Sequence, residues 1–382
     1  MLITHLRIFA QLAMVTVCAG CVYPFEPKGY NEINNLLVVE GDIIANGTTV
    51  VKLSRSVKLS SEEKNLPVER YAGVQVESSK GVVYSARETA AGVYEAATMN
   101  LDLSALYRLH ITTRNGMRYA SEYIPVSTSS IIDSIYYSID EKERCVNIYV
   151  SAHNPVGNTR FYRWSCEQDW EFTSDYRATI TYNTTGGMYT GFPVGYDIFT
   201  CWKKETYGSL VIDDTSTQSQ DLIVDKKVLT IHAGDVRLSY LYSVTVVQRG
   251  LTPEAFSYWN TLFKNSETMG SVFSSMPSEY RGNITCLTQP DQIVLGYINA
   301  TTLSTSKRLF IEKPFHTKAS CLGDDLKAFS MADRTTANRL LVEGYLPLNE
   351  GPDNTVVWAP NRCVDCTIRG TKNKPSWWPN DH

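Results

Sequence analysis

The sequence has no long apolar run after its first twenty residues, no surplus of positive charge and few histidines. No stretch of about 18 apolar residues follows the first twenty residues, so no helix that spans a membrane is expected in the rest of the chain. The net charge of −4 argues against a surface that neutralises nucleic-acid phosphates. The 6 histidines are scattered, with no His-Glu-x-x-His pair and no Gly-x-Ser-x-Gly turn. We therefore expect a protein that is not an enzyme and has no metal or cofactor.

The N-terminus resembles a bacterial export signal. Arg7 precedes a short apolar run, Ile8 to Val17, which is followed by Cys18-Ala19-Gly20 and then Cys21. Such a run is too short to span a bilayer and is typical of a signal peptide. Small residues directly before a cysteine resemble a lipobox, which predicts removal of residues 1–20 and lipidation of Cys21. The alternative is an ordinary secretory signal followed by a cysteine that occurs there by chance.

The remaining cysteines indicate disulfides. Seven of the 9 cysteines follow Cys21, and an exported chain reaches a compartment where disulfides persist. An odd number leaves at least one free thiol. We favour a bond between Cys166 and Cys201, which flank one long loop, and a second bond from Cys321 to Cys363 or Cys366, although spacing cannot fix connectivity. For the Cys363-x-x-Cys366 motif we favour structural disulfides over a redox pair or a zinc site, because no further ligands stand at zinc-site spacing.

Alternating apolar residues and Asn-Gly turns predict β structure in the first part of the chain. After a polar tether over residues 21–35, the segments 36–44 and 48–53 flank Asn46-Gly47, a favoured hairpin turn. A similar pattern surrounds Asn115-Gly116. Short strands at this spacing predict an immunoglobulin-like sandwich of about seven strands over residues 36–128.

A second β-rich domain is expected over residues 129–382. Its clearest strand is 238–248, and one helix is expected near 252–268, where Thr252 can cap the helix and Pro253 suits its first turn. A shorter helix is expected near Leu326 to Met331, and a Cys-containing tail ends the chain. The fold class is therefore mainly β, with a second sandwich-like domain that carries one or two helices.

An aromatic stretch over residues 176–202 is the best candidate for ligand binding. Its aromatic residues alternate with glycines, and exposed rings can stack on sugars or on peptide groups. The alternative is a tyrosine-rich hairpin packed on its own domain. The candidate residues are Tyr182, Tyr189, Phe192, Tyr196 and Trp202.

Asp133-Ser134-Ile135 matches a short acceptor pattern for bacterial O-glycosylation, which makes Ser134 a candidate for modification. An Asp-Ser pair at a domain junction is equally explained as part of a turn.

Five short segments, spread over most of the chain after Cys21, have a distinctive order and spacing. They are Cys21-Val22-Tyr23-Pro24-Phe25, Leu37-Val38-Val39-Glu40-Gly41, Thr252-Pro253-Glu254-Ala255-Phe256, Val294-Leu295-Gly296-Tyr297 and Lys374-Pro375-Ser376-Trp377-Trp378. Together they resemble a known family of Bacteroidota lipoproteins, domain-of-unknown-function family 4249. No catalytic residue is implied by the resemblance.

The resemblance implies an outer-membrane lipoprotein that assists a TonB-dependent receptor in nutrient uptake, with a glycan or a peptide as ligand. The alternative function is a structural or adhesive surface protein. Glu26 is the one acidic residue close behind Cys21, and we expect display on the cell surface rather than on the periplasmic side.

Overall fold

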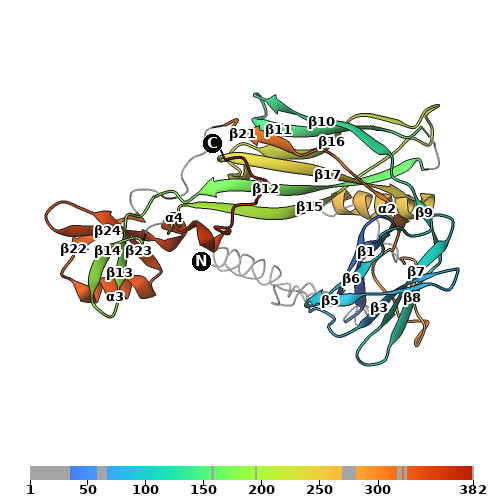
Figure 1. Cartoon of the computed structure of the whole chain (residues 1–382), viewed down its shortest axis with the longest axis horizontal. Helices are drawn as coiled ribbons and strands as arrows, with labels where there is room; N and C mark the ends of the chain where they lie inside the picture. The colour runs from blue at the N-terminus through green and yellow to red at the C-terminus, as the bar shows by residue number, and fades with distance from the viewer. Residues whose placement is uncertain are drawn as a thin grey trace, which may run out of the picture.

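The computed structural model describes residues 35–57, 67–155, 159–193, 196–268, 281–315, 321 and 325–380. It is mainly β, with 50% strand and 10% helix, as the sequence predicted. Three bodies are visible in Figure 1: a central sandwich, a first body below one end of it, and a small lobe that projects from the other end. In the described part of the chain, no helix is long and apolar enough to cross a membrane.

The first body is a rolled sheet around a core of 21 buried residues. The Asn46-Gly47 turn joins its first two strands, as expected, with Leu37 opposite Arg55 and Asp42 opposite Val50. Apolar side chains alternate with polar ones along these strands, so one face fills the core. Its strands are β1 (Leu37–Ile44), β2 (Thr48–Arg55), β3 (Gly73–Ser78), β4 (Val83–Ser85), β5 (Arg87–Ala90), β6 (Val93–Ala97), β7 (Leu106–Thr112), β8 (Arg118–Ser121), β9 (Ile124–Ser127), β18 (Ile284–Cys286) and β19 (Ala300–Thr301).

Residues 281–302 return to the first body after the chain has built most of the sandwich. The strand β19 lies parallel to both β1 and β9, which is unlike an all-antiparallel sandwich. Gly296 allows this return segment to lie against β1, because a Cβ there would collide with the Val39 carbonyl. The sequence placed this segment in the second domain, whereas its apolar residues fill the first core.

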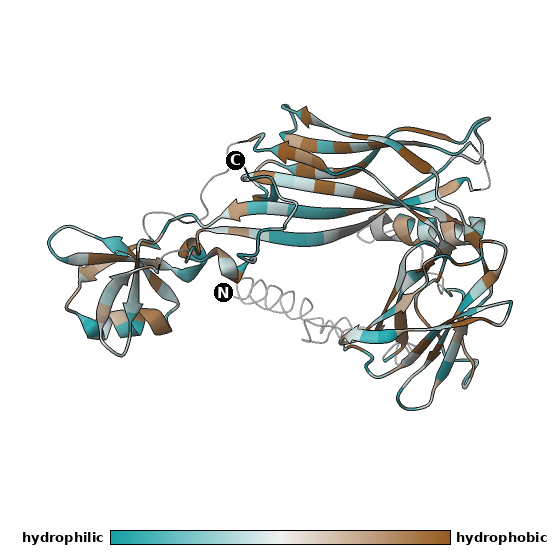
Figure 2. Cartoon of the chain, viewed as in Figure 1, coloured by the Kyte–Doolittle hydropathy of each residue, from teal (hydrophilic) through white to brown (hydrophobic). Residues whose placement is uncertain are grey.

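The central sandwich has two layers. A three-stranded sheet, β10-β11-β16, covers a five-stranded sheet in which β15, β12 and β17 are neighbours and β20 and β21 both pair with β17. Figure 2 shows hydrophobic bands along β11, β16 and β17, and 21 buried residues make up the sandwich core. The elements are β10 (Ile131–Asp140), β11 (Cys145–His153), β12 (Phe161–Thr173), β15 (Thr200–Asp214), β16 (Leu222–His232), β17 (Leu241–Leu251), β20 (Leu303–Thr305), β21 (Leu309–Glu312), α2 (Pro253–Thr268) and a 3-10 turn at Val236–Leu238.

The helix α2 confirms the expectation for residues 252–268. The Thr252 hydroxyl accepts a hydrogen bond from the Ala255 amide at 3.1 Å, which caps the helix N-terminus as the sequence predicted.

A buried charge cluster joins the first body to the sandwich. The carboxylate of Asp42 in β1 is 6% exposed and forms ion pairs with Arg163 of β12 and Arg249 of β17. The ring of Trp259 in α2 lies 4.6 Å from the Arg163 guanidinium. Because these charges are shielded from water, the contact fixes how the two bodies meet.

The small lobe is assembled from two separate segments of the chain. One is the hairpin between β12 and β15, and the other follows β21. The helix expected near Leu326 to Met331 is wrong: these residues form β22, where Phe329 packs against Trp358, and the helix α3 begins after its cap at Asp333. The elements are β13 (Ile180–Asn183), β14 (Met188–Gly191), β22 (Lys327–Ser330), α3 (Arg334–Val342), β23 (Tyr345–Glu350), β24 (Thr355–Pro360), α4 (Asn361–Val364) and a 3-10 turn at Cys366–Ile368.

Candidate functional site

Tyr182 and Tyr189 support the core of the small lobe. They stand opposite each other in the β13–β14 hairpin, with ring centroids 4.9 Å apart. Both rings pack against Trp358, at 5.8 and 6.3 Å, and Trp358 is fully buried. Tyr182 and Tyr189 therefore belong to a hairpin packed on its own domain, the alternative given above. Their rings contact other rings of the lobe.

Phe192 and Tyr196 form an aromatic pair beyond the hairpin, in which Phe192 is half-buried against the lobe core and Tyr196 is exposed. Their rings are stacked, with centroids 5.4 Å apart and planes at 16°. Tyr196 is 48% exposed. The ammonium of Lys372, which arrives from the C-terminal tail, lies 4.1 Å from the centre of the Tyr196 ring. The pair thus presents an exposed aromatic ring together with a cation that lies over it.

A hollow of about 460 Å³ lies beside this pair. The Arg177 guanidinium covers the Phe199 ring at 4.1 Å and stands 3.8 Å from the Asp197 carboxylate. Charges of both signs therefore stand at the rim, above a lining that includes three aromatic rings. The lining residues are Arg177, Ala178, Thr179, Gly191, Phe192, Tyr196, Asp197, Ile198 and Phe199.

Sequence reasoning found only part of this site. Arg177, Asp197 and Phe199 lie within the aromatic stretch, but their grouping depends on how the chain folds back after the hairpin. Lys372 was missed because it is far from the stretch in sequence. No local pattern could have indicated it.

Trp202 lies outside the hollow. Its backbone forms two hydrogen bonds of 2.8 Å with Thr371, so the C-terminal tail continues the edge of β15. The tail then places Trp378 over the outer face of the sandwich, where the indole donates to the Glu171 carboxylate at 2.8 Å. Trp202 therefore helps to attach the C-terminal tail to the sandwich and does not line the hollow.

One disulfide ties the C-terminal segment to the sandwich, a second lies within the lobe, and one expected pairing is wrong. Cys201 bonds to Cys366, with Cα atoms 5.7 Å apart, and Cys321 bonds to Cys363, with Cα atoms 5.9 Å apart. Cys166 is a buried free thiol, because its side chain points into the sandwich core from the middle of β12. The two cysteines of the Cys-x-x-Cys motif thus reach different partners.

One group in the described part of the chain has metal-ligand geometry. Ligand atoms of Asp175, Cys321 and Cys363 lie within 4.8 Å of one another. The two sulfurs are joined in a disulfide, and Asp175 accepts a hydrogen bond from the Cys321 amide at 3.0 Å. Because a metal binds thiolate and not disulfide sulfur, the donor set does not fit a metal in this state.

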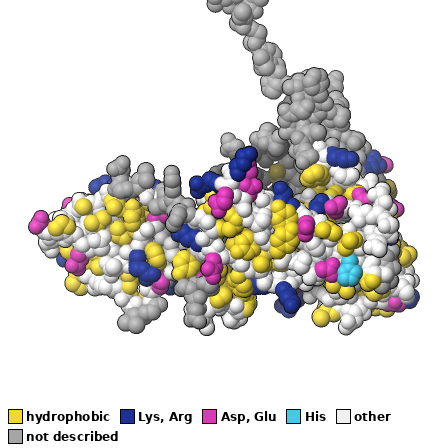
Figure 3. All heavy atoms as spheres, turned by 90° about the horizontal axis from the view of Figure 1, so that it is seen from above, with side chains coloured by type: hydrophobic (Ala, Val, Ile, Leu, Met, Phe, Trp, Pro, Cys, Tyr) yellow, Lys and Arg dark blue, Asp and Glu magenta, His cyan; other side chains and the backbone are white. Residues whose placement is uncertain are grey.

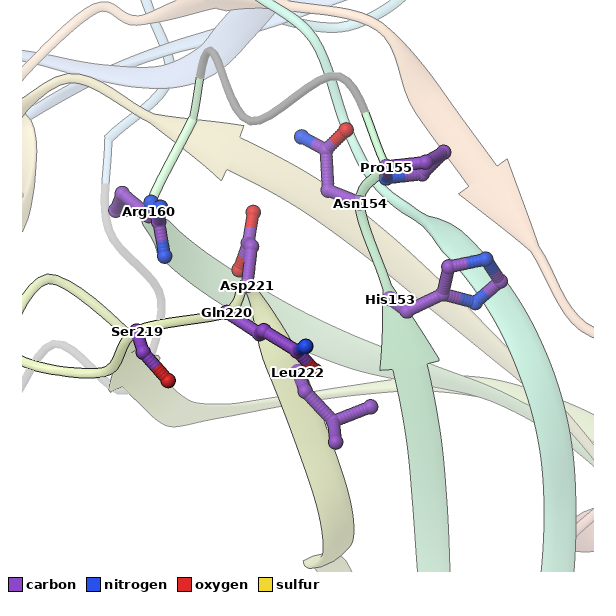
Figure 4. A pocket seen from close by; sticks show the side chains of 8 residues that line it. All are labelled: His153, Asn154, Pro155, Arg160, Ser219, Gln220, Asp221 and Leu222. Atoms are coloured by element: carbon purple, nitrogen blue, oxygen red, sulfur yellow. The ribbon is translucent and has the colours of Figure 1, made fainter.

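A second hollow, of about 420 Å³, lies at one end of the sandwich. Figure 4 shows the Asp221 side chain between Arg160 and Asn154, while the His153 ring points away from it. Asp221 is buried and accepts hydrogen bonds of 2.5 Å from the hydroxyls of Tyr162 and Thr215. Burial and the neighbouring carboxylate raise the pKa of Tyr162. Both carboxylate oxygens of Asp221 already accept hydrogen bonds within the sandwich, so this hollow is a weaker candidate for ligand binding.

A third hollow, of about 650 Å³, opens between α2 and the first body. Glu122, Glu254 and Arg281 stand at it together with Tyr258 and Tyr297, whose rings are 5.0 Å apart. Burial raises the pKa of both tyrosines. Both of its rings are half-buried, whereas the lobe hollow has an exposed ring, that of Tyr196.

Ser134 is exposed in β10, next to an irregularity in the pairing with β11. Cys21 and residues 22–34 of the expected tether lie outside the described residues.

Comparison with known proteins places the chain in a family. No curated protein matches the sequence. A family model described as "Domain of unknown function (DUF4249)" matches residues 22–307, about three quarters of the chain. The match covers the first body, most of the sandwich and the β13–β14 hairpin, and it ends before the second segment of the small lobe. The chain therefore belongs to the DUF4249 family.

Proposed function

We propose that this chain is an exported outer-membrane lipoprotein, anchored through Cys21, that binds a glycan or a peptide in the hollow of the small lobe. It acts without catalysis, as an accessory of a TonB-dependent receptor in nutrient uptake. The exposed Tyr196 ring, stacked on Phe192 beside charges of both signs, carries this proposal.

The chemistry of the hollow suits an amphipathic ligand. A sugar ring or a peptide plane can stack on an exposed aromatic face, and the polar atoms of such a ligand need donors and acceptors around it. Arg177 and Lys372 supply donors, and Asp197 supplies an acceptor.

The two disulfides support export. Disulfides persist in oxidising compartments and are rare in the cytosol. The partnership with a receptor and the location on the cell surface come from the family resemblance.

Ligand binding is tested with Tyr196→Ala against a panel of soluble oligosaccharides and short peptides, by calorimetry. We expect at least one panel member to bind and the variant to bind it about tenfold more weakly, because a stacked face is lost. The matched control is Tyr123→Ala: Tyr123 is also exposed and has the Arg108 guanidinium 4.7 Å from its ring, but it lies in the first body. Equal losses in the two variants would contradict the proposal.

The anchor is tested with Cys21→Ser, followed by membrane fractionation and metabolic labelling with palmitate. We expect loss of label and of processing. Cys18→Ser is the control, since position 18 lies within the expected signal and should leave lipidation intact. A Cys21→Ser product that is processed and retained with membranes as before would refute the anchor.

The receptor partnership is tested by crosslinking in cells and purification in mild detergent. We expect one outer-membrane barrel to be recovered in proportion to the bait, and nutrient uptake to fall when the gene is deleted. Unchanged uptake together with impaired surface attachment would favour the adhesive alternative.

A further inference from the structure

Strand β10 leaves one edge of the upper sheet open. It pairs with β11, and no other described strand pairs with it. Seen from above, hydrophobic side chains gather on the surface of the sandwich (Figure 3). In β10 itself the exposed apolar residues include Ile131, Tyr137 and Ile139, at 60%, 38% and 41%.

Tyr137 and Ile139 point toward the core and yet stay exposed. They stand opposite Ile148 and Val146 of β11, which are fully buried in the sandwich core. Residues directly opposite in a sheet share a face, so Tyr137 and Ile139 lie on the inner face. They remain exposed because the sheet ends at β10, and an added strand would cover them.

Other sheet edges of the sandwich carry the usual protection against pairing. The edge strand β16 contains Lys226 and Lys227, and Asp225 has a positive φ of 51° where its register shifts. The edge strand β15 carries Lys203 and Lys204. Charges and bulges of this kind discourage a further strand. By contrast, β10 has no lysine, arginine or proline over Ile131–Asp140, and its one irregularity lies near its start.

The residues of β10 are complementary to themselves about Tyr137. Ile135 and Ile139 lie two residues to either side of it, on the same face. If two copies pair antiparallel about this point, Tyr137 meets Tyr137 of the second copy, and Ile135 meets Ile139 twice. Asp133 meets Glu141 only at the two ends of the pair, where Glu141 lies beyond the strand and Asp133 is already bonded to His153. A shift by one residue would place inner side chains against outer ones.

Shifts by two residues are also unfavourable. In one direction Ile139 would meet Asp133, and in the other Ile135 would meet Glu141. Of these registers, only the one centred on Tyr137 places each of the three apolar residues opposite an apolar partner.

We propose that β10 is a dimerisation edge, at which two copies of this chain join their upper sheets into one continuous sheet of six strands about a two-fold axis. Main-chain hydrogen bonds across the new pair supply the contact, and the Ile135, Tyr137 and Ile139 side chains fix its register.

Sedimentation velocity on the chain from Val22 to His382, which keeps every described residue, tests this proposal across a concentration series. We expect a reversible monomer–dimer equilibrium. Tyr137→Lys should weaken the dimer at least tenfold, because it places two like charges opposite each other. The control is Val224→Lys, since Val224 is 64% exposed on the β16 edge and should leave the dimer unchanged.

Cysteine crosslinking tests the register without relying on a destabilised variant. Tyr137→Cys should form a disulfide-linked dimer on mild oxidation, whereas Ser138→Cys should not, since Ser138 would face Tyr136 of the second copy. A chain that stays monomeric at every concentration would overturn the proposal. So would a dimer that survives Tyr137→Lys, or equal crosslinking of the two cysteine variants.

Discussion

The first body and the small lobe are both built around β strands, but they are stabilised in different ways. The first body has one core of 21 buried residues and no disulfide among its described residues. The small lobe has two thin clusters of 6 and 5 buried residues, and the Cys321–Cys363 disulfide is part of the larger one, while Cys201–Cys366 ties the following segment to the sandwich core. A core that buries little apolar surface needs covalent support. The lobe that carries the candidate site is therefore the part of the chain that depends on an oxidising environment.

The largest expected effect is that of Trp358→Ala. Trp358 is fully buried and contacts three other rings of the lobe, so its loss should cost about 3 to 5 kcal/mol. We expect hydrogen exchange to rise in β13, β14 and β22–β24, while β1 and β2 stay protected. A uniform rise across the chain would show that the lobe and the first body unfold together.

Next is the double variant Cys321→Ser, Cys363→Ser. The bond closes a loop with a sequence separation of 42, and its removal should cost the lobe about 3 to 4 kcal/mol. Limited trypsin digestion should then cut within α3 and β22, where the oxidised chain resists. The first body serves as the internal control. Its cleavage at the same rate would show that the disulfide does not stabilise the lobe in particular.

Asp42→Asn probes the junction between the first body and the sandwich. The change leaves Arg163 and Arg249 close together without their carboxylate, which should cost about 3 kcal/mol. We expect a lower melting temperature and faster exchange in β1 and α2. The control is Asp102→Asn, because Asp102 is an exposed partner of Lys80 and should change the melting temperature little. If the two variants melt alike, the junction charges do not hold the bodies together.

The smallest effect concerns the free thiol of Cys166. Burial raises its pKa to about 12, so the group stays protonated in the folded chain well above the pH at which an ordinary cysteine ionises. We expect a thiol reagent to react slowly with Cys166 at pH 9 and rapidly after unfolding in guanidinium. Rapid labelling of Cys166 in the folded chain would contradict this expectation, because it would show that the sandwich core opens readily.

Local patterns predicted the parts of the fold that local contacts decide. The Asn46-Gly47 hairpin and the capped helix after Thr252 follow from the residues that form them, and the mainly β class follows from the alternation along the strands. In each case the signal lies within a few residues of the element.

Long-range partners could not be predicted in this way. The return of residues 281–302 to the first core depends on Gly296 lying against β1, and the hollow depends on Lys372 meeting Tyr196. The Cys166–Cys201 pairing was inferred because the two cysteines flank one long loop, but the alternation of side chains along β12 points Cys166 into the core. The apolar residues near Leu326 form a strand and not a helix, because Phe329 and Trp358 lie on the neighbouring strands β22 and β24.

The bond between Cys201 and Cys366, with a sequence separation of 165, has a consequence for biogenesis. Under the export proposed above, the chain emerges N-terminus first, so Cys201 leaves the export channel long before Cys366 and soon after Cys166. A thiol oxidase that acts at once would therefore join the wrong pair, and the hairpin that bears Tyr182 would wait for Trp358 to arrive. Correct maturation thus calls for late oxidation or for an isomerase that reshuffles the early bond.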